Sequence, residues 1–284
     1  MPEIRQSITR YALILDGQAT PLHDVDGGLI RASVATIREG TQPVARKQIS
    51  GMQYEPFRIR TGLSMSKALM DWIKGAATGT FARKNGSIAV LNIENKVQSY
   101  RNFRNALIEE ITVPSLDATS SAAAFLTVTI KPEEITYAKG DNAAIRIAVG
   151  AAQKAWIASN FAVRVGQLPC ARTSKVESFA MRRSMAGQMP IVDYPNLKLT
   201  ISDVDMDQWQ SWFTDFVVNG NNDQAKELQG SIDFLSPARE VIGSVELSQI
   251  GIFALEPEKS TAGTAAVARF SVELYVEKMG LTIK

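Results

Sequence analysis

The feature that most constrains the fold of this chain is an internal repeat in which separate segments recur at one constant spacing. The segment Gly-Ser-Ile at 86–88 recurs at 230–232, and the alternating apolar run at 126–130 recurs at 270–274. Two separate segments with one spacing are the signature of repeated structural units. A length of 284 residues allows two ordinary domains. We therefore expect a tandem duplication.

Each copy contains one segment with the apolar spacing of an amphipathic helix. In the first copy, the predicted helix core consists of Met65, Leu69, Trp72 and Ile73. Ser64 is expected to cap this helix and Gly75 to end it. In the second copy, the apolar stripe consists of Met206, Trp209, Phe213, Phe216 and Val217. We assign Trp209, Phe213 and Phe216 to the structural core of that helix.

The rest of each copy consists of short alternating segments separated by turn residues, a pattern typical of half-buried strands. We expect a mainly β protein in which each domain is an antiparallel sandwich or barrel with one packed helix. The predicted boundaries are 1–138 for the first domain, 139–156 for a linker and 157–284 for the second domain. Two small hydrophobic cores are expected rather than one.

The composition argues against catalysis. One histidine, His23, and one cysteine, Cys170, exclude histidine clusters, intramolecular disulfides and cysteine-based zinc cages. The formal net charge of +2 is too small to indicate bulk binding to nucleic acid. The chain contains no apolar run of the roughly 18 residues that a membrane-spanning helix needs. We expect no enzyme activity, no catalytic residue, no cofactor, no metal and no membrane partner.

The order and spacing of several motifs in the first copy resemble the tail-tube protein family of contractile phage tails and phage-like contractile injection systems. These motifs are Arg46-Lys47, Gly51-x-x-Tyr54, Gly62-x-x-Met65-Ser66, Asp71-Trp72-Ile73, Arg83-Lys84-Asn85-Gly86-Ser87-Ile88, Asn105-Ala106-Leu107-Ile108 and Pro114-x-Leu116-Asp117-Ala118. Together they cover most of residues 10–137. The second copy keeps the helix, the Gly-Ser-Ile strand and the closing strand, but has Leu228-Gln229-Gly230 in place of Arg-Lys-Asn-Gly.

The resemblance implies two tandem tail-tube-like domains and a way of assembling them. Domains of this family join edge to edge into six-fold rings, and the rings stack into a tube inside a contractile sheath. An extended hairpin makes the contact between rings. In this chain we expect the hairpin at 37–59 and its counterpart at 178–199, both too long for a simple two-residue turn. The expected ring-stacking residues, with the tip at 48–53, are Arg46, Lys47, Gln48, Gly51, Met52 and Tyr54.

The resemblance therefore implies a non-catalytic structural protein of a virion tail or phage-like particle, assembled in the bacterial cytoplasm. The implied partners are further copies of the chain, the sheath, the baseplate or hub and adjacent tube proteins, with DNA or an effector passing through the channel. Three chains would give one ring of six domains, and six chains would give a double ring or a ring with an outer decorating layer. A tube subunit, a tube-initiating hub and a terminal adaptor all fit the sequence.

The alternative is a soluble two-domain β-sandwich module that binds a carbohydrate or protein ligand. Such a module needs exposed aromatic residues on its loops. Of the four tryptophans, only Trp156 lies outside the predicted helices, in the linker.

Overall fold

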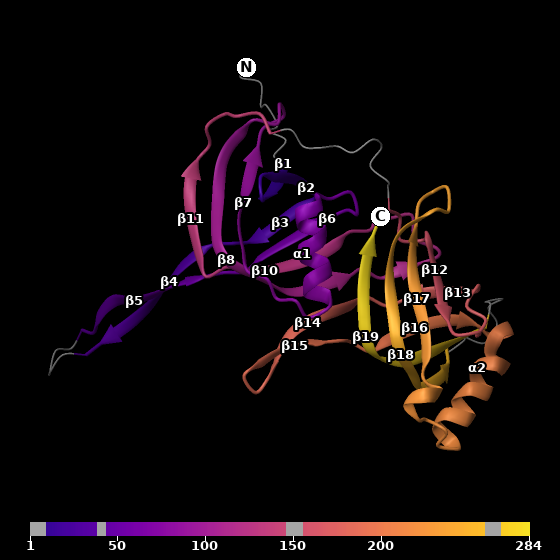
Figure 1. Ribbon diagram of the computed structural model, residues 1–284. Coiled ribbons are helices and arrows are strands. Elements are labelled where there is room, and N and C mark those ends of the chain that lie inside the picture. Colours follow the sequence, from indigo (N-terminus) through magenta and orange to yellow (C-terminus); the bar gives the residue numbers. More distant parts are fainter. Residues whose placement is uncertain (1–9, 39–43, 146–155, 259–267) are drawn as a thin grey trace.

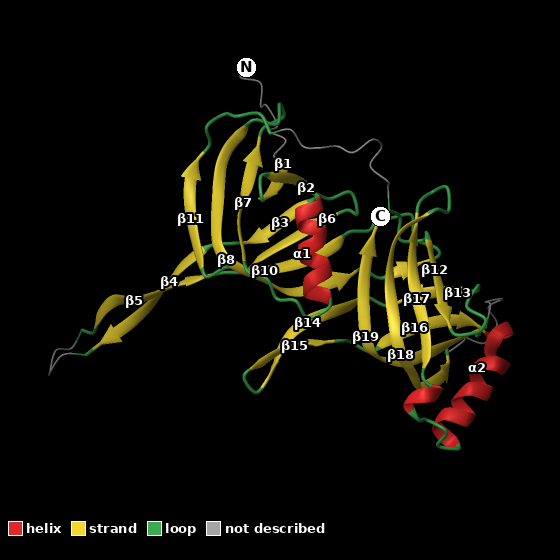
Figure 2. Cartoon of the chain, in the orientation of Figure 1, coloured by secondary structure: helices red, strands yellow, loops and turns green. Residues whose placement is uncertain are grey.

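Antiparallel strands make up most of the protein (Figure 2). The computed structural model describes residues 10–38, 44–145, 156–258 and 268–284. The predicted mainly β class is confirmed. The predicted linker at 139–156 lies mostly outside the described residues. No helix in the described ranges is long and apolar enough to cross a membrane.

The first half of the chain contains one helix and a series of strands (Figure 1). In chain order these elements are β1 (Arg10–Leu15), β2 (Gln18–Leu22), β3 (Asp24–Gly27), β4 (Ile30–Ile37), β5 (Arg46–Tyr54), β6 (Phe57–Thr61), α1 (Lys67–Ala77), β7 (Lys84–Leu91), β8 (Val97–Val113), β9 (Leu116–Asp117), β10 (Leu126–Lys131) and β11 (Glu134–Lys139).

The second half follows the same order with small differences. Its elements are β12 (Phe161–Val165), β13 (Thr173–Val176), β14 (Phe179–Ala186), β15 (Met189–Asp193), β16 (Leu197–Ser202), the short helix η1 (Asp203–Asp205), α2 (Met206–Phe213), the π-helical turn η2 (Thr214–Val218), the short helix η3 (Gln224–Lys226), β17 (Leu228–Leu235), β18 (Val241–Pro257) and β19 (Arg269–Ile283). The single strand β19 takes the place of β10 and β11.

The central strand of each half carries the same pairing irregularities. β8 pairs with β7, β10 and β11, and β18 pairs with β17 and β19. The register shifts just before Gly86 in β7 and just before Gly230 in β17. Asn105 in β8 and Gln249 in β18 both have positive φ. Both pairs of positions have the spacing of the sequence repeat, so the two halves share one pairing pattern, including the places where the ladder is interrupted.

The two halves also share strands. β14 of the second half pairs with the end of β8 in the first half, from Phe179 opposite Val113 to Arg182 opposite Glu110. β9 of the first half pairs with β13 of the second half. As a result, both the ten-stranded sheet and the seven-stranded sheet contain strands from both halves.

One large hydrophobic core spans both halves, together with a small cluster confined to the first half. α1 lies between β8 of its own half and β19 of the other half (Figure 1). Trp156 is buried rather than exposed in a linker, and its ring centroid lies 4.4 Å from that of Phe234. The prediction of two small cores is therefore wrong, because the shared strands bring apolar faces of both halves together.

The first helix begins two residues later than predicted. Ser66 rather than Ser64 is the N-cap, since Ser66 Oγ accepts a hydrogen bond from the Leu69 amide. The Thr20 hydroxyl, on β2, donates to Ser66 Oγ at 2.8 Å and accepts from the Ser66 amide at 3.0 Å. This contact with β2 fixes the helix start, and Met65 therefore precedes the helix.

Both helices turn most of the predicted apolar stripe toward the core. The buried members are Leu69, Trp72, Ile73, Trp209 and Phe216, whereas Met65 and Phe213 are partly buried. α1 continues past Gly75 to Ala77, because Thr78 rather than the glycine is its C-cap. Val217, in η2, is 40% exposed and lies outside the core.

Candidate functional site

The first hairpin carries every residue that we assigned to ring stacking. It consists of β4 and β5, forms a two-stranded sheet and projects from the body of the protein (Figure 1). The assigned residues all lie on β5 and are Arg46, Lys47, Gln48, Gly51, Met52 and Tyr54. The hairpin begins at Ile30 rather than at 37. Because residues 48–53 lie inside β5 and Ile37 pairs with Arg46, the predicted tip at 48–53 is wrong.

The first hairpin exposes large apolar side chains on and beside both strands. They are Leu29, Val34, Ile37, Val44, Ile49 and Met52. Within the described ranges, the hairpin pairs with no other strand. A two-stranded hairpin with free edges is marginally stable and is a template for pairing with another chain. Exposed apolar side chains on such an element indicate a surface that another protein covers.

The second hairpin pairs with a strand of the same chain, β8. β14 and β15 are connected by Gly187 and Gln188, and Gly187 has a φ of 63°. This is a two-residue turn, so the prediction of a longer connection is wrong. The reason is that glycine adopts the left-handed conformation that such a turn requires. At its root, Phe179 and Met181 are buried against the end of β8.

Charge-assisted hydrogen bonds hold the root of the second hairpin on β8. Arg182 Nε donates to Glu110 Oε2 at 2.7 Å, and the Thr112 hydroxyl donates to Glu110 Oε1 at 3.0 Å. Desolvation by partial burial raises the pKa of the Glu110 carboxyl, but these hydrogen bonds and the charges of Arg182 and Arg58 outweigh it. The Glu110 pKa therefore lies below its ordinary value. In addition, the Ser178 hydroxyl donates to the Val113 carbonyl at 2.9 Å.

The second hairpin also contacts the end of the first helix. The Tyr194 hydroxyl, just after β15, donates to the Ala77 carbonyl at the C-terminus of α1 at 2.9 Å. This carbonyl is one of the acceptors that a helix leaves without an intrahelical donor at its last turn. The Arg183 guanidinium lies 5.4 Å from the centre of the Phe81 ring. We call the whole contact, made by β14, β15 and Tyr194 on β8 and α1, the internal junction.

The sequence did not reveal the internal junction. Met181, Glu110 and Tyr194 carry no motif of their own. The available signal was the repeat itself, because Tyr54 and Tyr194 both follow a hairpin and precede a strand of the same pattern. Which segments of the two halves pair with each other depends on how the halves are placed in space, and a local sequence pattern does not show this.

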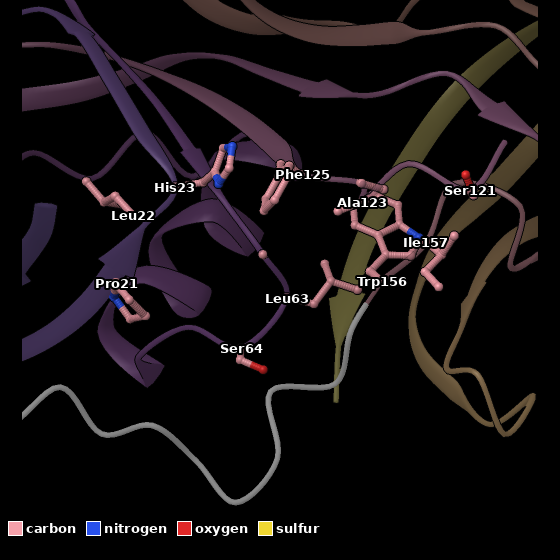
Figure 3. A pocket seen from close by; sticks show the side chains of 12 residues that line it. Pro21, Leu22, His23, Leu63, Ser64, Ser121, Ala123, Phe125, Trp156 and Ile157 are labelled. Atoms are coloured by element: carbon pink, nitrogen blue, oxygen red, sulfur yellow. The ribbon is translucent and has the colours of Figure 1, made fainter. Parts of the chain in front are cut away.

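A cavity of about 560 Å³ is lined by residues of both halves (Figure 3). His23 stacks on Phe125 with ring centroids 4.1 Å apart, and Trp156 also lines the cavity. The buried Trp156 Nε1 has no hydrogen-bond partner among the described residues. The lining carries one imidazole and no carboxylate, so it contains no acid–base pair.

Other reactive groups are occupied by structural contacts. Cys170 is buried, and desolvation raises the pKa of its thiol to about 11, so the thiolate is scarce at neutral pH. Asp205, also buried, accepts a hydrogen bond of 2.8 Å from Arg172. In the described ranges, no group of three or more histidine, cysteine, aspartate or glutamate side chains is placed to hold a metal ion.

The matches to known proteins described below each cover less than half of this chain. Residues 8–136 match the family of the T4-like virus tail tube protein gp19. No curated protein matches the chain.

Among solved structures, a chain of the sheath-tube complex of the extracellular contractile injection system PVC in its extended state is 22% identical, with a TM-score of 0.41, and the match covers 46% of this chain and 88% of that one. The anti-feeding prophage cap, a tube-terminating cap, gives 23% identity and a TM-score of 0.41 over 46% and 88% of the two chains. The PVC sheath/tube terminator gives 22% and 0.40 over 49% and 96%. The motifs of the first copy lie within residues 8–136, the segment that matches the T4-like virus tail tube family.

Proposed function

We propose that this chain is a non-catalytic structural protein of a contractile phage tail or phage-like injection system, and that it forms rings of six tail-tube-like domains. The observation that carries the proposal is the internal junction, in which one half docks a hairpin on the central strand of the other half. The match of residues 8–136 to the T4-like virus tail tube family supports the proposed class of protein. The constant spacing between equivalent pairing irregularities supports a tandem duplication, with domains at 1–138 and 157–284.

Three chains supply six domains, and this is the ring that we propose. Its role is to continue, start or end a tube, with further copies of the chain, tube proteins, the sheath and the baseplate as partners and DNA or an effector in the channel. The particle forms in the bacterial cytoplasm. In the ring, the part of the first hairpin beyond the Ile30–Tyr54 pair, including Arg46, Lys47 and Met52, contacts the adjacent ring.

The test is negative-stain electron microscopy of the purified protein, with mass photometry of the same sample. Rings of six similar lobes with the mass of three chains are expected. A protein that stays a single chain at all concentrations would contradict the proposal. Shortening the first hairpin by replacing 36–47 with a two-residue Asn-Gly turn should leave single rings and abolish their stacking. Stacks formed by this variant at wild-type levels would remove the hairpin from the contact between rings.

A further inference from the structure

We propose that neighbouring chains join through a copy of the internal junction, with the first hairpin of one chain seated on the end of β18 in the next chain. The occupant of this surface is therefore a second copy of the chain. The inference rests on the proposed ring and identifies the surfaces that close it.

The roots of the two hairpins are equivalent residue by residue. Residues 57–61 of β6 and 197–201 of β16 pair with equivalent segments of β10 and β19, so Phe57 corresponds to Leu197. Tyr54 and Tyr194 each lie three positions earlier in the chain and keep this correspondence. Within the hairpins, the pair Arg31–Gln53 then corresponds to the pair Arg182–Asp193.

Two residues, Met181 and Tyr194, hold the second hairpin in place, and this correspondence identifies their counterparts in the first hairpin. Ile30 corresponds to Met181, which is buried on β8, and Tyr54 corresponds to Tyr194, which binds the end of α1. Within the described ranges, the Tyr54 hydroxyl has no hydrogen-bond partner. Both side chains are partly buried against the core of their own chain, but within the described ranges β4 pairs with no strand other than β5. The first hairpin therefore carries the same kind of root, an apolar side chain and a tyrosine, with one strand edge free.

The second half also contains a surface equivalent to the one on which β14 docks. The end of β8, where β14 docks, corresponds to residues 254–257 of β18. These residues pair with β19 on one edge, and within the described ranges no strand occupies the other edge. Ile111, under β14, is 2% exposed, whereas its counterpart Leu255 is only partly buried. The difference follows from the absence of a hairpin on β18.

The end of the second helix is open in the same way. Ala77, whose carbonyl binds Tyr194, is fully buried, whereas Val217, in the last turn of the helical segment of the second half, is 40% exposed. A hairpin seated on β18 would bring Tyr54 of one chain to the last turn of the helical segment that ends at Val218 in the other. The carbonyls of that turn would accept its hydrogen bond.

Three differences make the contact between chains weaker than the internal junction. The counterpart of Glu110 is Ala254, so the contact lacks the ion pair that Arg182 makes inside the chain. The counterpart of Val113 is Pro257, which has no amide hydrogen to donate to a neighbouring strand. The Ile30 amide also donates to the exposed Tyr137 hydroxyl at 3.1 Å, and β18 of the next chain must displace that hydroxyl. All three differences fit a contact that forms between separate chains.

Cysteine cross-linking tests the register. The correspondence places Ile30 of one chain opposite Leu255 of the next, where directly opposite side chains have Cβ atoms about 4.5–5.5 Å apart. The double variant I30C/L255C, treated with a mild oxidant or a short bismaleimide, is expected to give covalent species up to three chains. The matched control M181C/I111C should link within one chain and keep the single-chain mass. The native Cys170 is buried and also present in both.

The outcomes separate this inference from the proposed function. Covalent species of several chains support both. Rings that are visible by electron microscopy but do not cross-link would refute the β18 contact and leave the ring intact. A protein that neither forms rings nor cross-links, even when concentrated, would refute the ring and the contact together.

A hydroxyl deletion provides a second readout. Y54F should weaken the association of chains by about 2- to 12-fold per contact, the range expected for one hydrogen bond, without changing the stability of the single chain. Y194F should lower single-chain stability instead. Association of Y54F equal to that of the wild type would remove Tyr54 from the contact.

Discussion

Two methionines in different hairpins allow the internal junction to be tested by one kind of substitution. Met181 is 2% exposed in the junction, and Met52 is 67% exposed on the first hairpin. Met→Ala removes the same side-chain atoms at both positions. Truncating a buried methionine costs about 2–5 kcal/mol in free energy of unfolding, since it loses transfer free energy and leaves a cavity. Truncating an exposed one costs less than about 0.5 kcal/mol.

We therefore expect M181A to lower the free energy of unfolding by about 2–5 kcal/mol at any protein concentration. M52A should leave the single chain unchanged and weaken only its association. The assay is equilibrium urea unfolding followed by tryptophan fluorescence, which the buried Trp72 and Trp209 report from the first and the second half. Because one core spans both halves, a single cooperative transition is expected.

Any of three results would refute this reasoning. M181A within about 0.5 kcal/mol of the wild type would mean that β14 does not rest on β8 in solution. Two separated transitions, with M181A affecting neither midpoint, would mean that the halves fold as independent units. Equal losses in M181A and M52A would show that burial in the junction is not what distinguishes the two sites.

Three further predictions concern single positions. G230A should lower the free energy of unfolding by about 1–3 kcal/mol in a thermal unfolding assay, because its Cβ would lie 2.2 Å from the Arg164 carbonyl oxygen. The control G62A, whose Cβ would point into open space, should stay within about 1 kcal/mol of the wild type. Equal effects of the two substitutions would contradict the argument from close approach. The lowered pKa of Glu110 means that its contribution is present above the unfolded-state pKa and is lost as the pH falls through the folded-state pKa, so urea titrations from about pH 7 to pH 3 should show a smaller acid loss in E110Q than in the wild type; parallel curves would contradict this. With a thiol pKa of about 11, Cys170 should react with a disulfide reagent at about pH 8 at least 100-fold more slowly in the folded than in the urea-unfolded protein, and comparable rates would show that the thiol is accessible.

Local patterns were enough for much of this fold. Alternation of apolar and polar residues predicted the strands at 126–130 and 270–274, and apolar spacing predicted one helix in each half. These signals are local, because side chains repeat every two residues in a strand and every 3.6 in a helix. The repeat spacing and the tail-tube motifs also lie within the printed sequence, and the family match covers the same half of the chain.

Only the tertiary structure decided where the two halves meet. Gly86 and Gly230, the repeat positions, lie inside β7 and β17, where backbone and side-chain atoms of neighbouring strands leave no room for a Cβ. Ser66 became the helix cap because Thr20 binds it across the fold, and Trp156 is buried by contact with Phe234.

The same reason explains the hairpins, whose sequence pattern is shared but whose surroundings differ. A hairpin's own residues set its internal register, whereas its outer edge and exposed face are completed by whatever strand lies beside it. In the second hairpin, β14 pairs with β8 of the same chain, whereas β4 and β5 pair with no further strand of the described chain. Sequence by itself determined that the chain has two such arms, and the spatial order of the two halves decided which of them was left open.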